Sequence, residues 1–269
     1  MHWKQFPKTL RALRRAQKRD ILGDTFNSME KSQMIDKLFA VGAHFGYAPS
    51  RRHPSVASFI FGQKGGTELF DLEKTSECLE NALAFVKSLA ADRKVVLFVG
   101  GKAEARGALK RAAERLNQPY SSGRWIGGSL TNFSEIKRRL ARLSELTSMR
   151  EKGELAKFTK LERLMIDREI TDLENMFGGL RGMTKLPDAL VIVDAKHEMI
   201  AVAEAKKLGI PVVALLNSDC DARGISYPIP ANDASLDSIT YVLDEIAKVY
   251  AANLAPEKTA PAAGDTASA

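Results

Sequence analysis

Short apolar runs alternate along this chain with segments of helical periodicity, and this alternation constrains the fold more than any other feature. Residues 94–99, 189–193 and 211–216 have the length and composition of buried strands, and residues 103–116 and 197–208 have helical spacing between them. Strands that are apolar throughout must be covered on both faces, and strands that alternate with helices favour parallel pairing with right-handed crossovers. The sequence therefore predicts an α/β protein built on one covered parallel sheet.

Further elements extend this pattern toward both ends of the chain. Residues 59–62, 67–72 and 226–229 are predicted as short strands. A helix is predicted through residue 90, and a closing helix over 234–250 with Leu236, Ile239, Leu243, Ile246 and Val249 on one face.

One insertion breaks the alternation. Residues 130–150 and 159–179 are strongly charged and helical, and each has a single apolar face with steps of three and four, carried by Phe133, Ile136, Leu140, Leu143, Ile166, Ile170, Leu173 and Phe177. With no second apolar face, the two helices are expected to form a coiled-coil hairpin that projects from the sheet. The predicted organisation is a basic N-terminal arm (1–31), a single α/β domain (32–128 and 180–253), the hairpin insertion (129–179) and a disordered tail (254–269).

Positive charge is concentrated in two blocks. Residues 1–53 contain 11 Lys and Arg against 4 Asp and Glu, and residues 101–150 contain the same numbers, whereas the remaining segments are weakly acidic. Such separation allows one side of a protein to meet a polyanion while its other faces stay neutral. Nucleic acid is the expected partner, and an anionic membrane surface is the alternative.

Several classes of function lack the residues they need. Cys78 and Cys220 form no CxxC pair, and no apolar run approaches the roughly 18 residues of a membrane span. The turn at Gly100-Gly101-Lys102 follows a strand and opens a helix, but it fits neither the Walker nor the GxGxxG pattern. The four histidines form no catalytic or metal-binding pair. We therefore expect no catalytic residues, metal site, cofactor or small-molecule substrate.

Candidate RNA contacts fall within the basic blocks. Arg124 and Trp125 suit phosphate contact and base stacking, although a buried Trp that anchors the hairpin root explains the same residues equally well. Lys102 and Arg106 follow the glycine turn, which is otherwise only a tight connection. The remaining candidates have a structural alternative as a solvated helix face or as histidines bonded to local backbone, and they are His44, Arg51, Arg52, His53, Lys137, Arg138, Arg139 and Arg142.

Several motifs resemble one known family over about residues 32 to 250. They are His44-Phe45-Gly46, Leu72-Glu73-Lys74-Thr75, Phe98-Val99-Gly100, Arg124 to Asn132, Pro187 to Asp194 with His197-Glu198, Leu208 to Pro211, and Ile229 to Asp233. In this order and spacing, the chain resembles the bacterial small (30S) ribosomal subunit protein family number two.

The resemblance implies a Rossmann-like (flavodoxin-like) parallel sheet flanked by helices, with a protruding two-helix coiled-coil insertion. It also implies a structural, non-catalytic constituent of the small subunit, cytoplasmic and ribosome-bound, that contacts 16S rRNA between head and body and supports translation. Its expected partners are that RNA, neighbouring small-subunit proteins and, in many bacteria, the large mRNA-recruiting protein, with no membrane partner.

Three departures from the family pattern stand out. Arg51-Arg52-His53-Pro54 lacks a customary tryptophan, and the loop over 217–223 has an altered order in which Asp219 and Asp221 either cap the loop or hold a cation. The arm before Met29 is long, so it is either an RNA-binding extension or the product of an upstream start codon. Two other classes, a nucleotide-dependent enzyme and a coiled-coil scaffold for a protein partner, leave the two basic blocks unexplained.

Overall fold

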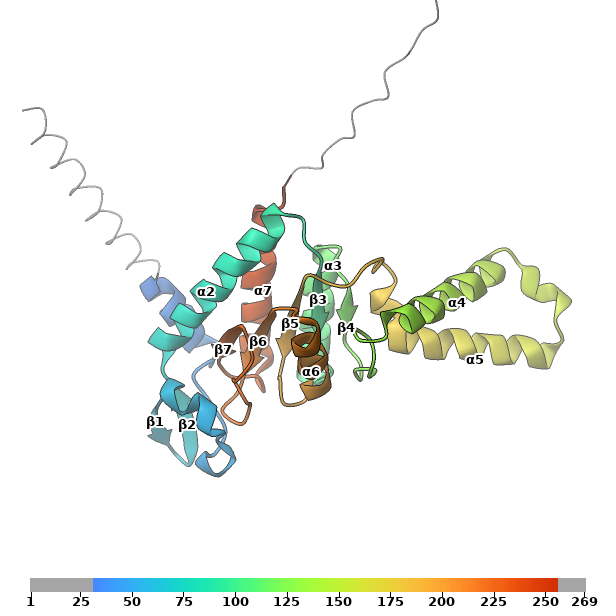
Figure 1. The fold of residues 1–269 in the computed structure, drawn as a ribbon. Coiled ribbons are helices and arrows are strands. Elements are labelled where there is room, and N and C mark those ends of the chain that lie inside the picture. The colour runs from blue at the N-terminus through green and yellow to red at the C-terminus, as the bar shows by residue number, and fades with distance from the viewer. Residues whose placement is uncertain (1–30, 256–269) are drawn as a thin grey trace, which may run out of the picture.

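A five-stranded parallel sheet forms the centre of the computed structural model, which describes residues 31–255 (Figure 1). The strand order is β4-β3-β5-β6-β7, and every neighbouring pair is parallel. The strands are β3 (Val96–Val99), β4 (Tyr120–Ser121), β5 (Ala189–Val193), β6 (Val212–Leu216) and β7 (Tyr227–Pro230). All residues of β3, β5 and β6 are buried, as their unbroken apolar runs require.

Helices cover both faces of this sheet. Helices α2 (Leu72–Ala91), α3 (Ala103–Arg115) and α7 (Leu236–Ala252) pack on one face, together with alternate strand residues such as Phe98. Helix α6 (Met199–Leu208) and the root of the hairpin cover the other face, against residues such as Leu97. The predicted Rossmann-like α/β fold is confirmed.

An N-terminal unit packs where β6 and β7 end. It contains a helix over residues 31–40, the short helices η1 (Pro49–Arg51) and η2 (Pro54–Phe59), and an antiparallel ribbon of β1 (Ile60–Lys64) and β2 (Thr67–Phe70). Backbone N–H groups join it to the sheet domain, because His53 donates to Ser218 O (2.8 Å) and Asn232 donates to Ala43 O (2.9 Å). The unit is therefore held against the carboxyl ends of the parallel strands.

The insertion is a pair of helices, α4 (Phe133–Glu151) and α5 (Lys160–Phe177), that lie side by side and project from the sheet domain (Figure 1). Two short helices flank α5, η3 (Glu154–Lys157) at the hairpin turn and η4 (Gly178–Leu180) at the root. The helices pack through buried side chains at Ile136, Leu143, Leu146, Ile170, Leu173 and Phe177. Coiled-coil supercoiling and the division into domains stay predictions.

Sequence and structure agree closely on the regular elements and differ at the edges. The edge strand β4, with only two residues, and the 3-10 helices were not predicted from the sequence. No helix in the described range combines the length and hydropathy that crossing a bilayer demands. The predicted basic arm and tail fall almost wholly outside residues 31–255.

Candidate nucleic-acid interface

The turn between β3 and α3 is filled by a carboxylate of the chain itself. The backbone N–H of Gly101 donates to Glu198 Oε1 at 2.8 Å, at the place where a phosphate sits in nucleotide-binding sheets. A Cβ on Gly101 would lie 2.8 Å from that oxygen and 2.8 Å from Gly123 O, so only glycine fits here. The turn is a tight connection whose anion position is already occupied by Glu198, which itself is only 2% exposed.

A cavity of about 380 Å³ opens beside this turn and brings together three of the predicted RNA contacts. Arg106, Arg124 and Trp125 line it, along with Gly101, His197, Glu198 and Ile200. Arg106 donates from Nε to Gly101 O at 2.9 Å, which fixes the direction of its guanidinium group. Within residues 31–255 neither Arg106 nor Arg124 forms an ion pair with a carboxylate.

Trp125 is the buried anchor of the hairpin root. It is 6% exposed, and its Nε1 donates to Glu204 Oε1 at 3.2 Å. The same carboxylate accepts four more hydrogen bonds, from the backbone N–H groups of Gly128 (2.7 Å), Leu130 (3.0 Å) and Thr131 (3.0 Å) and from Thr131 Oγ1 (3.2 Å). Glu204 on α6 therefore fixes the whole loop that leads into α4.

The charge of Glu204 is stabilised by these donors. Burial by itself would raise the pKa of this carboxyl, but the N–H groups of Thr131, Gly128 and Leu130 outweigh burial and hold its pKa below the ordinary value. Glu204 is therefore a carboxylate at neutral pH, as a residue that accepts five hydrogen bonds must be.

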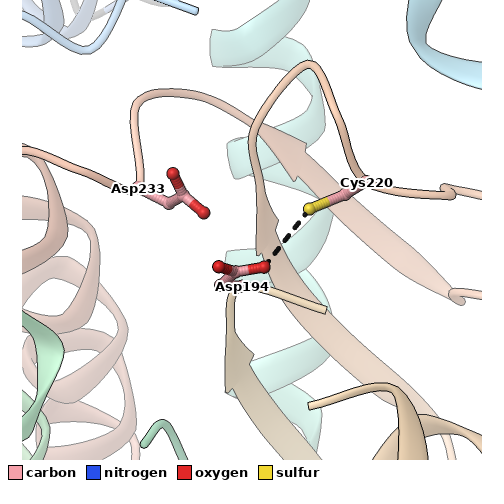
Figure 2. A group of neighbouring side chains, drawn as sticks. All are labelled: Asp194, Cys220 and Asp233. Atoms are coloured by element: carbon pink, nitrogen blue, oxygen red, sulfur yellow. Dashed lines mark hydrogen bonds between the residues drawn. The ribbon is translucent and has the colours of Figure 1, made fainter. Parts of the chain in front are cut away.

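Lys102 points away from solvent, into a cluster of acidic residues. Its Nζ lies 3.3 Å from Asp194 Oδ2 and 3.2 Å from Asp233 Oδ1, and donates to Tyr47 Oη at 3.3 Å. Figure 2 shows Asp194, Cys220 and Asp233 facing one another, with Cys220 Sγ donating to Asp194 Oδ1 at 3.5 Å. These three side chains offer potential metal-ligand atoms within 4.8 Å of one another, but the ammonium of Lys102 already supplies a positive charge to both carboxylates.

The two carboxylates of this cluster respond differently to their surroundings. Burial, followed by the charge of Asp194, raises the pKa of Asp233 to about 6. Burial also opposes ionisation of Asp194, but the backbone N–H of His197 and the Lys102 ammonium overcome it and lower the pKa of that group. Asp233 is completely buried, and its Oδ2 has no hydrogen-bond partner in the described part of the chain.

The basic residues of α4 are exposed, and most are paired with acids of the hairpin. Arg138 contacts Glu135 at 3.1 Å, Arg139 contacts the same carboxylate at 3.6 Å, and Arg142 bridges Glu145 and Glu169, both at 3.1 Å. Lys137 Nζ lies 5.0 Å from the ring centre of Phe133. These side chains are accessible to a partner, but part of their charge is neutralised within the hairpin.

The N-terminal candidates lie apart from the Arg124 cavity. His44 stacks on Phe39 with ring centres 4.7 Å apart, and burial lowers its pKa, so its ring is neutral at pH 7. Arg51 lies over the Tyr47 ring at 5.5 Å.

Their neighbours Arg52 and His53 also have partners within the chain. Arg52 contacts the buried Glu68 at 3.1 Å, and His53 Nδ1 accepts from the backbone N–H of Ser55 and so caps η2. In the altered loop, Asp221 pairs with Arg223 at 2.9 Å and Asp219 with Lys196 at 2.9 Å, as expected for residues that cap and pair locally.

A family model described as ribosomal protein S2 matches residues 38–252. The chain belongs to the ribosomal protein S2 family. Three relatives named small ribosomal subunit protein uS2 support this. The chain is 44% identical to that of Acidothermus cellulolyticus, over 82% of this chain and 80% of the relative. It is 40% identical to that of Coprothermobacter proteolyticus (79% and 80%) and 42% identical to that of Helicobacter hepaticus (78% and 80%).

Membership of the ribosomal protein S2 family makes the chain a structural ribosomal protein and not an enzyme, as the sequence motifs predicted. The S2 motifs also locate the acidic residues of the site. Glu198 and Asp233 lie in stretches that resemble the family motifs, whereas Glu204 lies outside those stretches and its role could not be predicted from the sequence.

Burial of Cys220 gives a first testable prediction. Burial, and then the charge of Asp194, raises the pKa of its thiol, so the reactive thiolate is scarce in the folded protein. In a Cys78→Ser variant we expect almost no reaction with Ellman's reagent until the chain is unfolded in guanidinium. Equal reaction rates in the folded and unfolded chain would contradict the buried position of Cys220.

Proposed function

We propose that this chain binds 16S ribosomal RNA between the head and body of the small subunit, as a non-catalytic constituent that supports translation. The observation that carries the proposal is the convergence of Arg106 and Arg124 on one cavity without acidic partners in the described chain. Arginine residues left free of carboxylates are available for phosphate, which they bind through paired N–H groups. The names of the relatives support a ribosomal location.

We rank the candidate RNA contacts by how free each side chain is to bind a phosphate. Arg106 and Arg124 come first, and the α4 residues Lys137, Arg138, Arg139 and Arg142 form a second, more exposed surface. The N-terminal residues His44, Arg51, Arg52 and His53 form a third. Lys102 and Trp125 would act by holding the surface in shape, because both are engaged with carboxylates inside the fold. The proposed partners are 16S rRNA, neighbouring small-subunit proteins and the large mRNA-recruiting protein, and the proposed location is the ribosome in the cytoplasm.

Co-sedimentation on sucrose gradients tests the proposal directly. A tagged chain expressed in cells should migrate with 30S and 70S particles at low salt and be released progressively at high salt, because phosphate contacts weaken as counterions compete. A chain that stays at the top of the gradient at both salt concentrations, despite adequate expression, would disprove ribosomal binding.

Single arginine variants test the ranking of the surfaces. Arg124→Ala should weaken binding to 16S rRNA more than Arg138→Ala, because Arg138 is 81% exposed and shares its charge with Glu135. We expect the Arg124 change to reduce the slope of log K against log salt by about one unit, as for loss of one phosphate contact. Filter binding across a salt series measures both slopes. Identical slopes for wild type and Arg124→Ala would remove Arg124 from the contact.

A further inference from the structure

The cavity between Arg106, Arg124 and Glu198 contains a hydrogen-bond acceptor as well as positive charge. Glu198 is 2% exposed, and its Oε1 is engaged by the Gly101 N–H at 2.8 Å and by His197 Nδ1 at 2.7 Å. Its second oxygen, Oε2, has no hydrogen-bond partner anywhere in residues 31–255, although Glu198 lines the cavity. This oxygen is not sealed from solvent, so a ligand in the cavity can donate a hydrogen bond to it.

The two arginines offer hydrogen-bond donors, whereas Glu198 offers an acceptor. The Nε of Arg106 is bonded to Gly101 O, which leaves the two terminal nitrogens of its guanidinium free to bind an anion. Arg124 has no hydrogen bond or ion pair within the described range. The cavity therefore presents donors for an anion beside an acceptor for a hydroxyl or amino group.

We propose that this cavity binds one unstacked ribonucleotide of a single-stranded RNA segment, with its phosphate on Arg106 and Arg124 and its ribose 2′-hydroxyl donating to Glu198 Oε2. A ribonucleotide carries both groups on adjacent parts of one unit, and a volume of about 380 Å³ lies in the range of small-ligand sites. Ile200, which is 54% exposed, adds apolar surface for the base. The 2′-hydroxyl is the group by which proteins distinguish RNA from DNA.

This inference rests on the proposed RNA-binding function and sharpens it. Proteins recognise single-stranded RNA through bases that are splayed out of the stack, whereas double-stranded RNA is bound mainly through its shape and backbone. The cavity is therefore expected to select a loop, bulge or strand end, and to bind duplex RNA no better than any other basic patch does.

The first test removes the phosphate contacts. Fluorescence anisotropy with labelled single-stranded oligouridylate measures binding to the full chain and to the Arg106→Ala and Arg124→Ala variants. Each variant should raise the Kd about tenfold, as expected for loss of a charge-assisted hydrogen bond. The matched control is Arg111→Ala, which removes the same charge from the exposed surface of α3 outside the cavity and should change the Kd less than about twofold. Equal effects of all three variants would overturn the proposal.

The second test addresses the 2′-hydroxyl and needs no mutation in its first step. Wild-type protein should bind the 2′-hydroxyl oligonucleotide about tenfold more tightly than its 2′-fluoro counterpart, because fluorine cannot donate to Glu198 Oε2. In Glu198→Gln the remaining oxygen accepts from the Gly101 N–H and an NH₂ group takes the place of Oε2, so the 2′-hydroxyl can no longer donate there and the preference should fall. A wild-type ratio near one, or a preference that Glu198→Gln leaves unchanged in a folded variant, would overturn the assignment.

Different results would contradict RNA binding by the chain and ribonucleotide binding by the cavity. If the chain neither sediments with ribosomal particles nor binds 16S rRNA in a salt-dependent manner, the proposed function fails and the cavity assignment fails with it. If those assays succeed but the Arg111 control matches the cavity variants, or 2′-fluoro RNA binds as well as RNA, only the ribonucleotide assignment is wrong.

Discussion

A Glu204→Ala variant should lose about 3 to 5 kcal/mol of its free energy of unfolding, because five donors lose their acceptor at once. The backbone N–H groups of Gly128, Leu130 and Thr131 would lose a charged partner in a partly buried site, and the Trp125 indole would lose its only hydrogen bond in the described structure. Urea denaturation at pH 7 measures the loss. We also expect faster proteolysis within the loop that leads into α4, since Glu204 fixes that loop.

A Glu204→Gln variant removes the charge of the side chain but keeps its size and shape. The amide keeps one oxygen acceptor but places an NH₂ group against N–H donors, so its loss of stability should be smaller than that of alanine but still measurable. The pKa of Glu204 is depressed in the folded chain, so its stabilising contribution is present above the ordinary carboxyl pKa and is lost as pH falls through the folded value. The glutamine variant should therefore lose less stability than wild type between neutral and acid pH. Equal losses of folding stability in wild type and Glu204→Gln as the pH falls would contradict an ionised Glu204 in the folded chain.

Replacing Lys102 by methionine should destabilise the chain by about 3 to 5 kcal/mol at pH 8, because it leaves the partly buried Asp194 and the buried Asp233 facing each other as anions without their cation. Denaturant unfolding compares this variant with wild type at pH 8 and pH 5. The deficit should be smaller at pH 5, since Asp233, whose pKa is raised to about 6, is then mostly neutral and leaves only one anion to repel.

The sign of this pH dependence follows from the folded pKa of Asp233. A raised carboxyl pKa means that the folded state holds the proton more tightly, so this group favours folding below about pH 4, and that contribution is lost as pH rises to about 6. Asp233→Asn removes the charge without removing the side chain, and it should restore part of the stability that Lys102→Met loses at pH 8. A double variant no more stable than Lys102→Met alone would argue against charge repulsion as the cause.

The regular elements could be predicted because local pattern and burial coincide in them. The strand over 189–193 was predicted with the bounds that it has in the structure, since five apolar residues in succession leave it no other role. Strand β4 was missed because its two residues, Tyr120 and Ser121, are a partly buried edge pair with no apolar run. A strand of this kind is defined by its neighbour β3 and not by its own sequence.

Only the basic residues of the site could be predicted from the sequence. Basic residues were found because they cluster along the sequence, whereas the acids that organise them, Glu198 just before α6 and Glu204 within it, lie more than seventy positions away along the chain. Lys102 and Trp125 illustrate the consequence. A lysine and a tryptophan in a basic loop suggest a surface contact, but whether their polar atoms face solvent depends on carboxylates that only the folded chain brings near.

Because the polypeptide is synthesised from its N-terminus, the position of α7 near the C-terminal end determines when the apolar faces of α2 and α3 can be covered. This helix, the last in the described residues, packs against both α2 and α3, and β3 finds its partner β5 only beyond the hairpin. A nascent chain that has reached the hairpin therefore holds α2 and α3 with their apolar faces uncovered. Contacts of such long sequence separation form late, and exposed apolar surface of this kind is what molecular chaperones bind. We expect the half-made chain to depend on such protection until α7 has left the exit tunnel.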